Sequence, residues 1–104
     1  MRNEKIFKIA VLLACFNRIK LTERCLASIY RNIPENCTLD IFLVNDGCTD
    51  GTPQMVCSKY SDVKLLEGDG SLFWNGGMHL AFSEAVKGNY DFYMWVNDDV
   101  DFFD

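Results

Sequence analysis

Apolar residues occur along the chain in blocks, separated by polar and glycine-containing segments. Residues 6–15 form a nearly continuous apolar run, "IFKIAVLLAC", and shorter runs follow at residues 39–44, 63–66 and 90–96. Continuous apolar runs of this kind are typical of strands buried on both faces of a parallel sheet. These four segments are therefore predicted to be strands.

Helical periodicity occupies the intervals between the predicted strands. The first interval has apolar positions at helical spacing, and these are Leu21, Cys25, Leu26 and Ile29. Residues 53–60 are predicted to form a second, short helix, because Pro53 suits a first helical turn. A third helix begins near Met78 and ends near Gly88. Strict alternation of strand and helix predicts an α/β fold, a Rossmann-like parallel sheet of about four strands with helices on both faces.

Composition narrows the class of protein. A chain of 104 residues with 49% hydrophobic residues predicts a single globular domain over residues 1–104. The net charge of −5 argues against a nucleic-acid partner, since phosphate backbones require positive charge. No apolar run approaches the roughly 20 residues of a membrane span, and the first residues do not resemble a signal peptide. We therefore expect a cytoplasmic protein.

Cysteine usage agrees with a reducing compartment. The five cysteines are an odd number without a CxxC pair. This spacing favours reduced thiols that pack as small hydrophobic side chains over a zinc site or a disulfide framework.

Polar side chains and glycines gather where each predicted strand ends. The four strands are followed by "ACFNR", "NDGCTDGT", "EGDGSLFWNGG" and "NDDVD". Parallel strands end at the same edge of a sheet, and ligands of such folds bind outside that edge. The candidate chemistry of this chain is therefore expected there.

An acidic cluster closes the chain, with Asp98, Asp99, Asp101 and Asp104 in the last seven residues. Two carboxylates about 4 Å apart repel by roughly 4 kcal/mol at an effective dielectric near 20. A divalent cation would compensate this charge, and oxygen ligands suit Mg²⁺ or Mn²⁺. The alternative is a solvated loop; the place at the end of a buried strand favours the metal.

Two other segments have competing interpretations. Asp46 and Gly47 fit ordinary turn chemistry, which the residues alone favour, but a carboxylate at a strand end can also bind the edge of a base. Trp74 suits either a platform for a ligand ring or a core residue. The segment "GDGSLFWNGG" contains no lysine or arginine and matches no phosphate-loop pattern, which argues against tight phosphate binding without a metal.

Taken together, these segments resemble the amino-terminal half of the family 2 glycosyltransferases, GT-A fold enzymes that use nucleotide-sugar donors. "KIAVLLACFNRIKLTERCLASI" is similar to the first strand and helix of that family, and "LDIFLVNDGCTDGT" to its second strand and acidic loop. "GNYDFYMWVNDDVD" is similar to the strand that leads into the family's DxD motif. Rhamnosyltransferase-like members are particularly similar, because asparagine also stands there in place of the first DxD aspartate.

The resemblance implies roles for individual residues. Its nucleotide-binding set comprises Asn17, Arg18, Asp46, Gly47, Trp74, Asn75, Asn97 and Asp98. Within this set, Asp46 would bind the base and Asp98 would face the ribose or a phosphate. Asp99 would be the principal metal ligand, and a second frame adds Asp101. The implied cofactor is Mg²⁺ or Mn²⁺, and the implied donor is a UDP- or dTDP-linked sugar.

The resemblance also implies what is missing. In this family the acceptor site and the catalytic base follow the DxD strand, so the base is expected after Asp104. We expect the chain to be a donor-binding part, truncated before the acceptor half, with little turnover alone. Truncation would leave "YDFYMWV" as an exposed edge, which predicts a two-fold homodimer.

Two other functions stay open. One is a non-catalytic nucleotide-binding fragment. The other, less favoured, is a Mg²⁺-binding receiver domain, which needs a lysine after a late strand. Lys87 instead precedes the last predicted strand.

Overall fold

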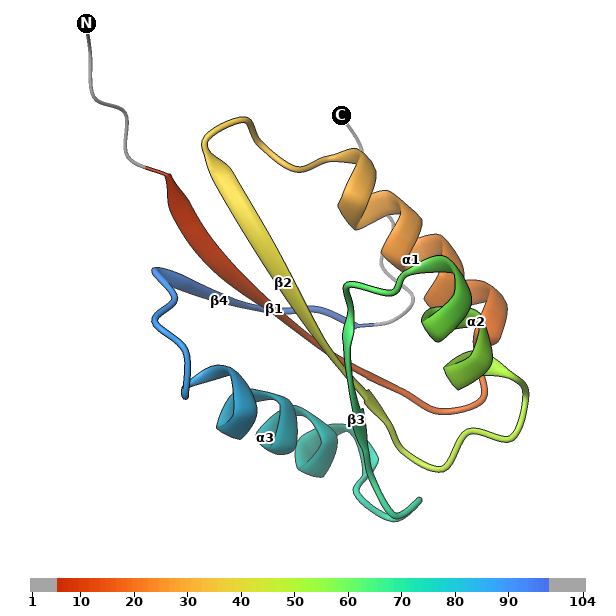
Figure 1. Ribbon diagram of the computed structural model, residues 1–104. Helices are drawn as coiled ribbons and strands as arrows, with labels where there is room; N and C mark the ends of the chain where they lie inside the picture. The colour runs from red at the N-terminus through yellow and green to blue at the C-terminus, as the bar shows by residue number, and fades with distance from the viewer. Residues whose placement is uncertain (1–5, 98–104) are drawn as a thin grey trace, which may run out of the picture.

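The computed structural model describes residues 6–97 and confirms the predicted alternation of strands and helices (Figure 1). The elements are β1 (Phe7–Cys15), α1 (Ile19–Arg31), β2 (Cys37–Asn45), α2 (Thr52–Lys59), β3 (Lys64–Glu67), α3 (Phe73–Ala85) and β4 (Phe92–Trp95).

The strands form one parallel sheet in the order β3-β2-β1-β4. β1 and β2 pair over their full nine residues, from Phe7 opposite Cys37 to Cys15 opposite Asn45. The outer strands β3 and β4 are only four residues long. The long central pair therefore carries most of the sheet, and its carboxyl ends project the first two loops to the same edge.

Both faces of the sheet are covered, which explains why the strands are apolar without alternation. Figure 1 shows α3 on the opposite side of the sheet from α1 and α2. Buried side chains between the sheet and α1 and α2 include Val11, Leu13, Leu26, Ile41 and Val56. Those between the sheet and α3 include Ala10, Leu12, Val44, Met78 and Ala81. Full burial of one such aliphatic side chain contributes about 1.5–3 kcal/mol, so β1 is anchored from both sides.

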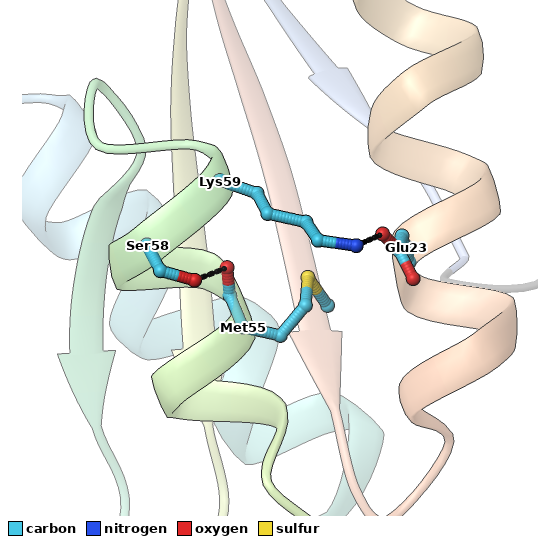
Figure 2. A network of polar contacts seen from close by, with 4 residues as sticks. All are labelled: Glu23, Met55, Ser58 and Lys59. Carbon is cyan, nitrogen blue, oxygen red and sulfur yellow. Dashed lines mark hydrogen bonds and ion pairs between the residues drawn. The ribbon is translucent and has the colours of Figure 1, made fainter.

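The two helices on one face also contact each other. Met55 of α2 is buried, and the Lys59 ammonium pairs with the Glu23 carboxylate of α1 (Figure 2). The hydrogen bond and the charge of Glu23 raise the pKa of Lys59. Such an exposed pair contributes little to stability, so the buried apolar contacts hold the helices in place.

The third helix begins earlier than predicted. α3 starts at Phe73 instead of near Met78, so part of the glycine-rich segment is its first turns. Glycine lowers helix propensity, which hid this start in the sequence. At Gly77 an added Cβ would lie 2.8 Å from the Ala14 Cβ, so the glycine allows the helix to approach β1 closely. α3 also ends at Ala85, before Gly88.

None of the helices within residues 6–97 is long and apolar enough to span a membrane. The longest, α1 and α3, have 13 residues, against the roughly 20 that a span requires.

β4 is shorter than predicted and pairs with β1 along one side. Its exposed large side chains are Phe92, Met94 and Trp95. An exposed aromatic edge is therefore present in the described residues, while dimerisation through it stays a prediction.

Candidate functional site

Three loops meet at the carboxyl edge of the sheet: residues 16–18 after β1, 46–51 after β2 and 68–72 after β3. A network of hydrogen bonds connects the middle loop to both neighbours. Its members come from positions far apart in sequence, so the network exists only in the folded chain.

Asp46 lies at the centre of this edge. Its backbone N–H donates to Cys15 O (3.2 Å), and its Oδ1 accepts from Gly70 N (2.8 Å) and Leu72 N (3.3 Å). The residue is only 4% exposed, and a buried carboxylate is tolerated when hydrogen bonds compensate its lost hydration. Asp46 therefore does more than shape its own turn, because it fixes the loop after β3.

Two glycines make the contact between these loops possible. Gly47 and Gly70 both have positive φ, at 80° and 92°. A Cβ added to Gly47 would lie 2.8 Å from the Gly70 Cα, closer than real Cβ contacts come. Gly47 thus serves both a left-handed turn and a close approach of two backbones.

Asn45 reinforces the same junction. Its buried side chain donates from Nδ2 to Glu67 Oε1 (2.9 Å) and accepts at Oδ1 from Cys48 N (2.9 Å). Its carbonyl oxygen accepts from Gly68 N (2.8 Å). The side chain and the backbone carbonyl of Asn45 therefore both connect the end of β2 to the end of β3.

Asn17 joins the first loop to the second. It has a positive φ of 51°, a left-handed conformation that asparagine tolerates better than most residues. Its Oδ1 accepts from Thr49 N (2.7 Å) and its backbone N–H donates to Cys48 Sγ (3.3 Å). Arg18 follows as the residue that precedes α1, and both Asn17 and Arg18 are exposed at the edge.

Asp50 makes a second bridge between these loops. Its Oδ2 accepts from Ile19 N (2.9 Å), and its Oδ1 accepts from Thr52 N (3.1 Å) and Thr52 Oγ1 (2.6 Å). Desolvation opposes the charged form, but the hydrogen bonds from Thr52 and Ile19 outweigh it and lower the pKa of Asp50. The only sign of this role in the sequence is an aspartate two positions before the threonine that begins α2.

Phe16 is a further residue that sequence reasoning missed. Phe16 is 54% exposed and directly follows β1. The ring atom Cε1 lies 3.9 Å from the point where a Gly47 Cβ would stand. An exposed aromatic side chain beside an exposed glycine is suited to pack against a planar ligand. The available signal was an aromatic residue that continues past a buried strand into a polar segment.

Of the remaining predicted site residues, three lie in the described part of the chain and three lie outside it. Trp74 and Asn75 lie in the first turn of α3 instead of in a loop, and Asn75 is exposed. Asn97 is exposed just after β4, and its carbonyl oxygen accepts from Cys25 Sγ (3.6 Å). Asp98, Asp99 and Asp101 lie outside the described residues.

Both candidate metal ligands, Asp99 and Asp101, are therefore outside the described residues. Within residues 6–97 no group of three or more His, Cys, Asp or Glu side chains is arranged to hold a metal ion. The described part of the edge thus offers hydrogen-bonding groups, an aromatic ring and backbone amides. The carboxylates of the chain end are hard oxygen donors of the type that Mg²⁺ and Mn²⁺ prefer.

Comparison with protein families gives a match over most of the chain. The sequence model described as Glycosyl transferase family 2 matches residues 10–103. Comparison with curated protein sequences gives no match.

Solved structures with the same fold include a mannosyltransferase and a UDP complex of TarS. The mannosyltransferase PcManGT from Pyrobaculum calidifontis, in complex with GDP-Man and Mn²⁺, is 20% identical with a TM-score of 0.77. The match covers 93% of this chain and 29% of that one. S. aureus TarS 1-349, in complex with UDP, is 20% identical with a TM-score of 0.69, covering 88% of this chain and 27% of that one. The chain thus spans less than a third of the length of either structure.

Proposed function

Because the chain belongs to glycosyl transferase family 2, we propose that it forms the nucleotide-sugar donor site of an enzyme that transfers a sugar to an acceptor hydroxyl. Its four-stranded α/β fold is that of the GT-A glycosyltransferases. In this proposal the chain is a single donor domain, and groups outside it supply the acceptor site and the catalytic base.

One observation carries the proposal: the Asp46 carboxylate joins two loops at the carboxyl edge, where ligands of parallel α/β sheets bind. We assign the base to the surface formed by Phe16 and Gly47, with Asp46 as the acceptor for a base N–H. A carboxylate accepts about four hydrogen bonds, so it can hold both a loop and a ligand donor. Because Asp46 is almost fully buried, base binding is expected to shift loop 68–72.

The other predicted residues belong to segments that begin at the same edge of the sheet. Asn17 and Arg18 stand on the side of the first loop, and Asn75 on the side of α3. We assign these side chains, with Trp74, to the sugar nucleotide beyond the base. Arg18 is the only one of these four side chains with a positive charge. Another group must therefore balance most of the negative charge of the diphosphate.

We assign this compensating charge to a divalent cation held by residues 97–101. Asn97, Asp98 and Asp99 replace the DxD triplet, with Asp99 as metal ligand, Asp98 toward ribose or phosphate, and Asp101 as a further ligand. A divalent cation bound there would stabilise the charge that develops on the departing diphosphate. The mannosyltransferase with the same fold was solved with GDP-Man and Mn²⁺, which supports a cation in the family.

The chemical step proposed for the complete enzyme is displacement at the anomeric carbon. The acceptor oxygen forms a bond to that carbon, a base takes its proton, and the bond to the nucleoside diphosphate breaks. The residues of this chain bind and orient the donor so that the anomeric carbon faces the acceptor, which is the positioning contribution to catalysis.

Calorimetric titration tests the proposal. The purified chain is titrated with UDP, dTDP and GDP, each with and without Mn²⁺, and the tightest case is repeated with Asp99→Ala and Asp46→Asn. We expect binding that requires Mn²⁺ and weakens about tenfold or more in both variants. Absence of binding at millimolar nucleotide would overturn the donor-site assignment. Binding that is unchanged in Asp99→Ala would overturn the metal assignment alone.

A further inference from the structure

Two cysteine sulfurs lie next to each other beneath the candidate nucleotide site. Cys15 is the last residue of β1 and is 2% exposed, whereas Cys48 lies half-buried in the loop after β2. Their Sγ atoms are 3.7 Å apart, although 33 residues separate them in sequence. Neither cysteine is part of a disulfide in this structure.

Hydrogen bonds to neighbouring backbone groups hold the two sulfurs in place. Cys15 Sγ donates to Val44 O (3.5 Å), and Cys48 Sγ donates to Cys15 O (3.5 Å) while accepting from Asn17 N (3.3 Å). The sulfur–sulfur bond of a disulfide is about 2.0 Å long, so the sulfurs need to close by about 1.7 Å. Cys48 is a loop residue, and rotation of its side chain with a small loop shift can supply that movement.

We propose that Cys15 and Cys48 form a reversible disulfide in the presence of a peroxide, making this pair a redox modification site. The Cys48 thiolate attacks one peroxide oxygen, the O–O bond breaks, and Cys48 becomes a sulfenic acid as water leaves. The Cys15 thiolate then attacks the Cys48 sulfur, and the hydroxyl leaves as a second water. In sum, two thiols and one hydrogen peroxide give one disulfide and two waters, and a dithiol reductant reverses the change.

The order of attack follows from exposure. Cys48 is the more accessible of the two, so it meets the oxidant first. Cys15 is buried against it and resolves the sulfenic acid before further oxidation, which is the arrangement of a reactive cysteine poised beside a resolving one.

The disulfide would act on the nucleotide loop. The Cys48 sulfur accepts the N–H of Asn17, whose left-handed conformation is held by contacts with Cys48 and Thr49. Moving that sulfur toward Cys15 removes one of these contacts. On the proposed function, on which this consequence alone rests, oxidation weakens nucleotide binding about tenfold, within the usual range of coupling between two sites.

Peptide mapping tests the disulfide without reference to nucleotide. The purified chain is treated with one equivalent of hydrogen peroxide, and the cysteine thiols that remain are alkylated. The protein is then digested, and the peptides are analysed by mass spectrometry with and without reductant. We expect a linked Cys15–Cys48 peptide lighter by two hydrogens than the sum of the reduced peptides. Cys57, exposed on α2, provides the matched control: Cys57→Ser retains the link, and Cys48→Ser loses it.

Other outcomes overturn the proposal. They are oxidation of Cys48 to sulfinic acid without a link, a link that joins another cysteine, or an unmodified pair after Cys57 has reacted. Titration of the oxidised chain with the nucleotide that binds best then tests the consequence. Unchanged affinity in a chain with the mapped disulfide would overturn the coupling, whereas a reduced chain that binds no nucleotide overturns the proposed function and leaves the redox site intact.

Discussion

The carboxylate of Asp50 accepts a hydrogen bond from the backbone N–H of Ile19, at 2.9 Å and across 31 residues of sequence. Ile19 is the first residue of α1, and the same carboxylate accepts from Thr52 N at the start of α2. The first N–H groups of a helix have no partner within the helix. One side chain therefore satisfies the open ends of two helices and fixes the loops that precede them.

Replacing this side chain should destabilise the fold. We expect Asp50→Ala to lower the free energy of unfolding by about 1–2 kcal/mol, as for the loss of a helix N-terminal acceptor. Urea denaturation measures the change. Asp69→Ala is the matched control, because Asp69 makes a similar pair of bonds to Ser71 in an exposed loop without joining two elements. A smaller loss in Asp50→Ala than in Asp69→Ala would contradict the bridging role.

The same residue predicts a pH dependence. Desolvation works against the Asp50 carboxylate, but bonds from Thr52 and Ile19 lower its pKa below the ordinary value of 3.8. The unfolded chain therefore binds the proton first, so the stabilisation is complete well above pH 3.8 and is lost as the pH falls through 3.8 toward the folded pKa. Unfolding free energies of the native chain and Asp50→Asn should differ at neutral pH, and the difference should shrink as the pH falls below 3.8. A constant difference would show that ionisation of Asp50 is not involved.

The close approach of Gly47 to Gly70 predicts unequal effects of two similar substitutions. Gly47→Ala and Gly51→Ala both place alanine at a positive φ, which costs about 1–2 kcal/mol. At Gly51 the nearest atom is the flexible Ile19 Cδ1 at 3.7 Å, whereas at Gly47 it is backbone at 2.8 Å. Gly47→Ala should therefore be the more destabilising by at least about 1 kcal/mol. Thermal unfolding of the two variants compares them directly, and equal losses would mean that the loops separate without cost.

Phe16 gives a prediction about binding. We expect Phe16→Ala to weaken nucleotide binding about tenfold, since stacking of a base on an aromatic ring contributes about 1–3 kcal/mol. Phe92→Ala is the control, because Phe92 is 55% exposed against 54% for Phe16 but lies on β4. Calorimetry on both variants should show a loss for Phe16 alone. Equal affinities would remove Phe16 from the site.

The sequence was sufficient to predict the order of elements, because the apolar runs of a fully covered parallel sheet are continuous and easily found. It was also sufficient to place the loops of Asn17 and Asp46 at one edge, since parallel strands end together. It was not sufficient to predict the start of α3. Gly76 and Gly77 lower the helix propensity of this segment, although Gly77 allows the helix to pack closely on Ala14.

Pairwise contacts across the edge could not be predicted. Turn chemistry accounts for Asp46 beside Gly47, and nothing in that local pattern shows that its carboxylate reaches Gly70 and Leu72. The odd number of cysteines and the absence of a CxxC pair favour thiols that pack as small hydrophobic side chains. The proximity of Cys15 to Cys48 arises from the register of β1 and β2, which a single sequence does not display.

The place of β4 in the sheet has a consequence for synthesis of the chain. β4 is the last of the described strands yet pairs with β1, so 83 residues of chain are synthesised between Lys8 and its hydrogen-bond partner Asp91. At a translation rate of about 5–20 residues per second, that interval is roughly 4 to 17 seconds. During this time one side of β1 has no strand beside it, although β2 can already cover the other. The nascent chain therefore passes through a stage at which its most apolar strand is half-paired, when a ribosome-associated chaperone has the greatest opportunity to bind it.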